Sequence, residues 1–211
     1  MKFFQTLLAK RNRKRLKDEA YAFLFEPYDG DEVVVFDTET TGLDPKKDEV
    51  ISIGAVKVKG NRILTSETFE VYLKTDRPIP AESIEVHGIR PCDLEYALSP
   101  PEGIERFLQF IGPRPLAGYY LEFDVAMINR YVKPWLGVEL PNPKIEVSGL
   151  YFDKKNFGIP QGNIDLRFDT ILANLGVPPM GRHNAVNDAI MTAMIFIKLN
   201  HTIKLKTGER T

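Results

Sequence analysis

The feature that most constrains the fold is a run of apolar residues, Val33 to Phe36, that ends directly in Asp37, Thr38 and Glu39. An unbroken run of β-branched and aromatic residues predicts a strand with both faces covered, as in a sheet that lies between two layers of other elements. Side chains alternate along a strand, so Asp37 and Glu39 should project from one face and Thr38 from the other. The fold therefore has to accommodate two carboxylates where a buried strand ends.

Two interpretations of this strand end remain open from the residues alone. Carboxylates about 7 Å apart on one face repel each other, and burying either one costs several kcal/mol. A divalent cation between them would make the arrangement favourable, because Mg²⁺ binds a few carboxylates and completes its shell with water and phosphate oxygens. The alternative is a strand that simply runs into a polar loop, since Asp and Thr are common at such ends.

Length and composition indicate one globular domain. The chain has 211 residues, of which 43% are apolar, enough for a sizeable core. Its single cysteine, Cys92, excludes an internal disulfide and a cysteine-based zinc site. No apolar run approaches the about 18 residues of a membrane span, and Met1 to Ala9 lacks the pattern of a secretion signal. We therefore expect a cytoplasmic protein that does not contact a membrane.

The order of predicted elements indicates an α/β fold. Residues 50–58 and 63–73 are predicted to be strands joined by the turn Lys59-Gly60-Asn61-Arg62, so the fold should open as an antiparallel meander. A strand at 115–119 followed by a helix at 123–135 fits a parallel crossover. This order predicts a mixed sheet with helices on its faces. Further helices are predicted over residues 3–25, 82–86, 92–98, 101–110, 166–175 and 185–199. Residues 133–161, with four prolines, are predicted to be irregular.

Charge is distributed unevenly along the chain. Residues 1–17 contain seven basic side chains and no acidic one, which leaves 21 basic and 29 acidic side chains in the rest. Such an acidic body would repel a polyanion unless bound cations neutralised part of it. The basic segment is compatible with steering of a phosphate backbone and, more commonly, with the solvated face of a helix.

Two later segments place acidic residues beside predicted elements. Asp124 lies in the first turn of a helix, where an isolated acid most commonly interacts with the helix macrodipole. His183 and Asp188 differ by five positions, about 140° around a helix, so they converge only if His183 precedes the helix on a loop. Taken alone, this segment is more typical of a helix capped by Asn184 with an exposed histidine in front.

Taken together, the three segments resemble the motifs of a known class of enzymes. In order and spacing they are similar to the three exonuclease motifs of the DEDDh class of 3′–5′ exonucleases, which includes the proofreading epsilon subunit of bacterial DNA polymerase III, ribonuclease T and oligoribonuclease. The segments are Asp37-Thr-Glu39-Thr-Thr-Gly, Phe123-Asp124 and His183-x-Ala185-x-x-Asp188-Ala189. The resemblance extends over roughly residues 32–199 and includes His87-Gly88-Ile89, a turn that the family often carries.

The resemblance implies a fold, a metal site and a reaction. The fold would be ribonuclease H-like, a mixed five-stranded sheet with its first three strands antiparallel and helices on its faces. The enzyme would hydrolyse the 3′ end of single-stranded nucleic acid and release nucleoside 5′-monophosphates by a two-metal mechanism. Two divalent cations, Mg²⁺ or Mn²⁺, would be bound by Asp37, Glu39, Asp124 and Asp188, with His183 as general base. Contacts to the terminal nucleotide would come from Thr40, Thr41 and Leu43.

The sequence departs from the family pattern at two places. The second motif usually has His-Asn where this chain has Tyr119 and Tyr120, which would either stack on bases or belong to the core. Many members carry Asp-Thr in the segment that corresponds to residues 145–150, which here reads Ile-Glu-Val-Ser-Gly-Leu.

We expect a basic helical extension at residues 1–30, an exonuclease domain at 31–200 and a short tail at 201–211. The extension matches nothing in the catalytic core and would clamp nucleic acid, dock a partner protein or mediate an oligomer contact. Because the tail is too short to be a polymerase-binding segment, a free-standing exonuclease is predicted. The alternatives are a proofreading accessory subunit that docks through the N-terminal helix, and a non-catalytic nucleic-acid-binding or interaction module.

Overall fold

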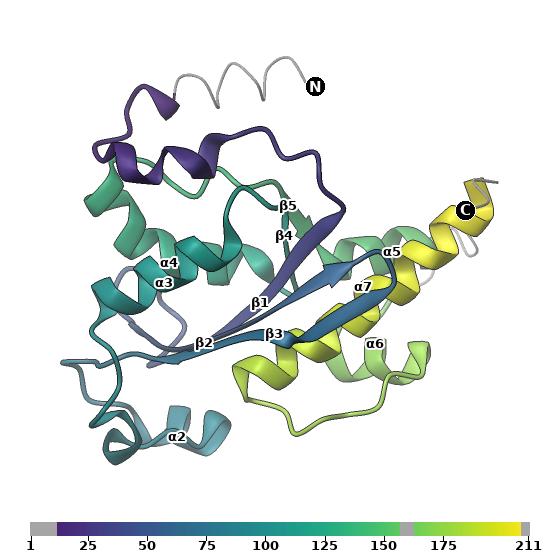
Figure 1. Ribbon diagram of the computed structural model, residues 1–211. Helices are drawn as coiled ribbons and strands as arrows, with labels where there is room; N and C mark the ends of the chain where they lie inside the picture. The colour runs from purple at the N-terminus through teal and green to yellow at the C-terminus, as the bar shows by residue number, and fades with distance from the viewer. Residues whose placement is uncertain (1–11, 157–162, 208–211) are drawn as a thin grey trace.

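The computed structural model describes residues 12–156 and 163–207, the segment 201–207 by its backbone alone. Figure 1 shows a twisted sheet between two groups of helices. The strands within these residues are β1 (Glu32–Thr40), β2 (Val50–Lys59), β3 (Arg62–Tyr72), β4 (Leu116–Gly118) and β5 (Lys144–Glu146). Their order in the sheet is β3-β2-β1-β4-β5, with β1 to β3 antiparallel and β4 and β5 parallel to β1. The predicted mixed sheet with an antiparallel opening is confirmed.

Helices cover both faces of this sheet (Figure 1). The helices within the described residues are α2 (Ala81–His87), α3 (Pro100–Ile111), α4 (Leu121–Leu136), α5 (Val147–Asn156), α6 (Phe168–Leu175) and α7 (Ala185–Thr207), with short 3₁₀ helices η1 (Glu19–Phe25) and η2 (Pro91–Leu94). Helices α3 and α4 share a core cluster with one face, and α5, α6 and α7 share a second cluster with the other. None of the helices in the described part of the chain is long and apolar enough to cross a bilayer.

Side-chain alternation along β1 separates the two cores. Val34 and Phe36 belong to the cluster with α3 and α4, where the rings of Phe36 and Phe107 have centroids 5.1 Å apart. Val33 and Val35 belong to the cluster with α7. The same alternation continues beyond the apolar run, so the side chains at positions 37 and 39 are directed to the α7 face and that at 38 to the α4 face.

The carboxyl end of β1 extends past its neighbour β4. The two strands pair only at Val34 and Val35, so the following residues of β1 have no strand partner on this side. Helix α4 starts after β4 at this open edge. The carboxyl ends of strands are where α/β sheets commonly bind ligands, and here that end lies near the starts of α4 and α7.

Most predicted elements are confirmed within about three residues of their expected ends. The hairpin turn is made by Gly60 and Asn61, between the paired residues Lys59 and Arg62. Gly60 has φ 58°, in agreement with a type II′ turn, which needs a positive φ at its first central position.

The prediction of one continuous helix over residues 3–25 is wrong in its described part, while residues 1–11 lie outside the described residues. The chain turns at 14–17 and continues as η1. The backbone N–H of Lys17 donates to the carbonyl of Leu136 (3.0 Å), and the carboxylate of Asp18 accepts from the N–H of Ala20 (3.0 Å). These two bonds replace a helical ladder with a turn and a new helix start.

The irregular segment predicted at 133–161 is also wrong where it is described, because β5 and α5 lie within it. Pro134 is in the last turn of α4, and Pro143 precedes β5 with its carbonyl accepting from the N–H of Leu116 (2.8 Å). Pro134 is thus accommodated near the end of a helix and Pro143 just before a strand, so neither of them prevents a regular element from forming.

Two helix predictions differ in length from the structure. The helix predicted at 92–98 is only the 3₁₀ turn η2, because the backbone of Leu98 pairs with the end of β3 through Tyr72 and Lys74. The last helix continues beyond the predicted Leu199 to Thr207.

The described part of the N-terminal segment packs on α4. Leu16, Tyr21 and Leu24 are buried in the cluster shared by α3 and α4, and the ring of Tyr21 lies edge-on to Trp135 with centroids 4.8 Å apart. A separate role for residues 1–30 stays a prediction.

Helix α7 lies directly against β2 at Gly54. A Cβ atom at this position would meet backbone atoms of Ala185 and Val186 at 2.2 Å. Gly54 is also the register partner of Asp37 on β1. The absence of a side chain at Gly54 therefore sets how closely the start of α7 approaches the acidic end of β1.

We predict that Gly54→Ala destabilises the protein, because the clash is with backbone atoms that cannot rotate away. Overpacking of this kind costs about 1–3 kcal/mol, which lowers Tm by several degrees in a chain of this size. Thermal unfolding followed by circular dichroism measures the effect. Gly149→Ala in α5 is the matched control, because its Cβ would meet nothing closer than 3.8 Å. An equal Tm for both variants would contradict the close approach.

Candidate active site

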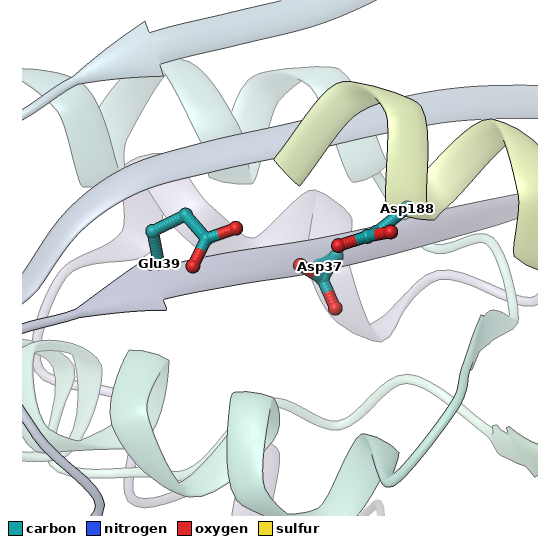
Figure 2. A group of neighbouring side chains, drawn as sticks. All are labelled: Asp37, Glu39 and Asp188. Atoms are coloured by element: carbon teal, nitrogen blue, oxygen red, sulfur yellow. The ribbon is translucent and has the colours of Figure 1, made fainter. Parts of the chain in front are cut away.

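Three carboxylates meet at the carboxyl end of β1. Asp37 and Glu39 come from the strand and Asp188 from the first turn of α7, and one oxygen from each lies within 4.8 Å of the others. Figure 2 shows the three side chains, with the carboxyl groups of Asp37 and Asp188 next to each other. Glu39 and Asp188 are only 8% and 9% exposed. Like charges this close and this poorly hydrated are unfavourable unless they bind protons or share a cation.

Asp124 lies beside this group at the start of α4. Its Oδ1 accepts hydrogen bonds from the backbone N–H of Thr38 (3.0 Å) and from the Thr38 hydroxyl (2.6 Å), and it is 3% exposed. Thr38 stands between the two acids of β1 in sequence, on the opposite face. These two hydrogen bonds hold the fourth carboxylate next to the open edge of the strand. Asp124 does not belong to the group of three residues whose oxygens lie within 4.8 Å of one another.

All four carboxylates and His183 line one pocket of about 500 Å³, which we call the acidic pocket. Its other walls include Thr40, Leu43, Val86, His87, Tyr119, Tyr120, Phe168 and Arg182. Arg182 is the only lysine or arginine among the described residues that line it.

Burial and mutual repulsion raise the pKa values of these carboxyl groups. The pKa of Glu39 rises from 4.5 to about 8, first through burial and then through Asp188 and Asp124. Burial raises the pKa of Asp124 to about 7. The pKa of Asp37 is raised well above its ordinary value by burial and then by Asp124 and Glu39, and burial also raises the pKa of Asp188. As anions, these groups are poorly stabilised by the protein itself.

The donor set fits a hard divalent cation. Carboxylate oxygens are the ligands that Mg²⁺ prefers in proteins. The Oδ1 atom of Asp188 is buried and has no hydrogen-bond partner among the described residues. Buried polar atoms are normally satisfied, so an unpartnered carboxylate oxygen in an acidic group agrees with a position for a cation.

His183 reaches the pocket from the loop before α7, as the five-residue spacing required. Its φ is 62°, and its backbone N–H donates to Oδ2 of Asp188 (2.9 Å). Asn184 caps the helix, its side chain accepting from the N–H of Asn187 (3.0 Å). The sequence left two alternatives for this segment, a capped helix and the convergence of His183 with Asp188. The structure has both.

A stack of side chains supports this loop. Arg182 donates to both carboxylate oxygens of Asp169 (3.0 and 2.8 Å), and its guanidinium lies 5.4 Å from the ring centroid of Phe168. The ring of Phe168 packs against Tyr119 with centroids 4.8 Å apart, and the Tyr119 hydroxyl donates to the carbonyl of Leu166 (3.0 Å). Tyr119 thus takes part in internal packing between β4, α6 and the loop before α7.

The predicted substrate-binding residues lie in two environments. Thr40 and Leu43 line the acidic pocket, and the side chain of Leu43 is 84% exposed. Thr41 is 2% exposed and is not part of the wall. Its hydroxyl accepts from the N–H of Glu49 (3.0 Å), and its carbonyl accepts from the hydroxyl of Ser83 (3.0 Å). Thr41 holds the loop together, and its contact with substrate stays a prediction.

The turn at His87 forms the wall of the pocket on the side of α2. Gly88 ends α2 at φ 73°, and Nδ1 of His87 accepts from the N–H of Ile89 (3.0 Å). Burial lowers the pKa of His87, and the proximity of His183 lowers it further. The sequence indicated this turn but not its position beside the acidic residues.

The role of Glu146 at the end of β5 is not predicted by the sequence. One of its oxygens accepts from the N–H of Leu121 (2.8 Å), and the other accepts from the N–H of Tyr120 (3.1 Å) and from Ser148. A single carboxylate thereby caps the starts of both α4 and α5. The signal available in the sequence was an acid in the segment that departs from the family pattern, residues 145–150.

Comparisons with known proteins identify the family of this chain. The family described as "Exonuclease" matches residues 34–196. DNA polymerase III subunit epsilon of Aquifex aeolicus is 33% identical over 175 residues, which is 83% of each chain. The PolC-type DNA polymerase III of Thermotoga maritima is 32% identical over 174 residues, or 81% of this chain. This chain spans only 12% of the length of that polymerase.

Solved structures with the same fold include cell-death related nuclease 4, with a TM-score of 0.70 at 17% identity, covering 82% of this chain and 64% of that one. E. coli exonuclease I in complex with a dT13 oligonucleotide has a TM-score of 0.65 at 17% identity, covering 84% of this chain and 42% of that one. These likenesses confirm the ribonuclease H-like fold. The family match over residues 34–196 and the identity to an epsilon subunit along most of both chains show that this chain belongs to the exonuclease family.

Proposed function

We propose that this chain is a metal-dependent 3′–5′ exonuclease that hydrolyses the terminal phosphodiester bond of single-stranded nucleic acid and releases nucleoside 5′-monophosphates. The observation that carries the proposal is the group formed by Asp37, Glu39 and Asp188, whose oxygens lie within 4.8 Å of one another in a pocket shared with His183. Family membership supports phosphodiester hydrolysis as the reaction.

Two divalent cations, Mg²⁺ or Mn²⁺, would be held by Asp37, Glu39, Asp124 and Asp188. Bound cations would supply the positive charge that an anionic phosphodiester needs and would lower the pKa of water. The raised carboxyl pKa values and the unpartnered oxygen of Asp188 support this assignment. With four carboxylates neutralised, the acidic body of the protein can accept a polyanion.

The side chains of the pocket then have distinct roles. His183 takes the proton from the attacking water, a role for which imidazole is the commonest side chain. Its backbone bond to Asp188 keeps it beside the carboxylate group. Thr40 and Leu43 contact the terminal nucleotide, for which the exposed side chain of Leu43 offers an apolar surface. The dT13 complex of E. coli exonuclease I supports a single strand as the substrate class.

A second candidate function is that of a proofreading subunit of a DNA polymerase. The identity to an epsilon subunit over 83% of both chains favours it. In this case residues 1–30 would form the docking segment for the polymerase. Co-elution of the chain with the replicative polymerase of its own cell, lost after deletion of residues 1–11, would support this candidate over a free-standing nuclease.

We predict that Asp37→Asn and His183→Ala each lower the rate of nucleotide release by about 10²–10⁴-fold, because one removes a ligand charge and the other the proton acceptor. The substrate is a 5′-labelled oligonucleotide, DNA or RNA, incubated with Mg²⁺ or Mn²⁺ and resolved as a ladder shortened from its 3′ end. Asp153→Asn, an exposed acid of α5, is the control and should retain full activity.

Circular dichroism should show that all three variants are folded. A rate near that of the wild type for either pocket variant would contradict the assignment. Binding of the oligonucleotide without any cleavage by the wild type would favour the non-catalytic module instead.

We predict that EDTA abolishes hydrolysis and that Mg²⁺ or Mn²⁺ restores it. Without cations the four carboxylates repel the substrate phosphate, so no residual activity is expected. The measurement is the same ladder assay after extensive chelation and after return of one metal at a time. Undiminished cleavage in EDTA would overturn the metal assignment.

Without metal, stability should fall as the pH rises. The pKa of Glu39 is 4.5 ordinarily and about 8 in the folded protein, so between these values the folded state holds a proton that the unfolded chain has released. The free energy of unfolding is therefore highest near the lower value and decreases toward the upper one. Tm measured in EDTA should decrease from about pH 5 to about pH 8, and Mn²⁺ should restore it at the alkaline end.

Glu39→Gln removes one of the titrating groups and should give a flatter dependence of Tm on pH in EDTA. A wild-type Tm that rises with pH over this window, or an unchanged slope in the variant, would contradict the pKa assignment.

A further inference from the structure

Tyr120 combines an exposed ring with a strained backbone beside the acidic pocket. Its side chain is 72% exposed and its φ is 60°. Only Tyr120 and His183 have a positive φ among the described residues other than glycine. A bulky residue rarely adopts this conformation, and an exposed ring gains no burial from it. Positions of this kind persist where the surroundings impose them, and they gather at functional sites.

The strained backbone of Tyr120 is held from both sides. Glu146 accepts hydrogen bonds from the backbone N–H groups of Tyr120 (3.1 Å) and Leu121 (2.8 Å). The preceding residue, Tyr119, is fixed by its ring contact with Phe168 and its hydroxyl bond to Leu166. The exposed ring is therefore presented from a rigid base at the start of α4.

Tyr120, like Tyr119, is part of the wall of two hollows. Tyr120 lines the acidic pocket and also an adjoining hollow of about 580 Å³, whose walls include Ser148, Asn163, Asp165 and Arg167. Both volumes lie within the range of about 300–1,000 Å³ that is usual for ligand pockets. A strand that places its terminal nucleotide in the acidic pocket and continues into the adjoining hollow passes over Tyr120.

We propose that the ring of Tyr120 is a stacking platform for the base next to the 3′-terminal one, and that the adjoining hollow receives the strand beyond it. The inference rests on the proposed function and deepens it by assigning a path for the substrate. Every base has a π face, so stacking on an aromatic ring binds single strands with little regard to sequence. Bases at a paired duplex end are already stacked on their neighbours, so the platform favours unpaired ends.

The test compares Tyr120→Ala, Tyr120→Phe and Tyr120→Trp with the wild type in the full chain. The matched control is Tyr96→Ala, because Tyr96 is 91% exposed and lines neither hollow. The measurements are KM and kcat for a five-nucleotide oligo-dT, and Kd for this oligonucleotide and for thymidine 5′-monophosphate in the His183→Ala background with Mg²⁺. Tm of each variant reports whether it is folded.

We expect Tyr120→Ala to weaken binding of the five-nucleotide strand by about 5- to 150-fold, with the effect in KM rather than kcat and no effect on the mononucleotide. Phe and Trp should restore binding, because they keep an aromatic face, and Tyr96→Ala should match the wild type. Unchanged binding by Tyr120→Ala, failure of Phe to rescue, or an equal loss for the mononucleotide would overturn the platform.

Failure of the platform and failure of the proposed function give different results. If the wild type hydrolyses the strand and Tyr120→Ala is indistinguishable from it, the platform is wrong and the exonuclease assignment stands. If the wild type binds the strand in a Tyr120-dependent way but hydrolyses nothing with any metal, the platform stands and the exonuclease assignment is wrong.

Discussion

Repulsion among buried carboxylates at the end of β1 is the constraint around which this protein is built. A hydrogen bond from Thr38 holds Asp124 around the strand edge, and a backbone N–H holds Asp188 at the start of α7. The missing side chain of Gly54 lets α7 approach closely enough for Asp188 to reach Asp37. Packing of the two cores thus offsets the cost of placing these groups together, a cost that cations would further reduce.

The sequence predicts the features that depend on local pattern. The apolar run before Asp37 and the alternation of side chains were enough to place Asp37 and Glu39 on one face, and the turn at Gly60 was enough to place the hairpin. The family resemblance added the fold. The predicted helix at the N-terminus fails because the bond that ends it, from Lys17 to Leu136, joins residues far apart in sequence. The strand β5 was not predicted because the prolines around it indicated an irregular segment, and β5 forms only by pairing with the distant strand β4.

The residues of the candidate site also fall into those that the sequence predicts and those that it does not. Its acids and His183 belong to compact motifs, whereas Glu146, Arg182 and Phe168 act through contacts between distant segments that no spacing reveals. Tyr119 and Tyr120 illustrate the limit. Adjacent and chemically identical, they have different surroundings, one packed against Phe168 and the other exposed at a positive φ. The sequence left packing and base stacking open for both, and only the three-dimensional structure separates them.

The two oxygens of Asp188 have different surroundings. Oδ2 is occupied by the N–H of His183, while Oδ1 has no partner among the described residues. A cation of the kind proposed above would therefore find Oδ1 available while Oδ2 keeps its bond to the loop that carries His183. In the proposed metal-bound protein, cation binding and anchoring of the loop would use different oxygens of Asp188, so the hydrogen bond that holds the loop before α7 would not have to break.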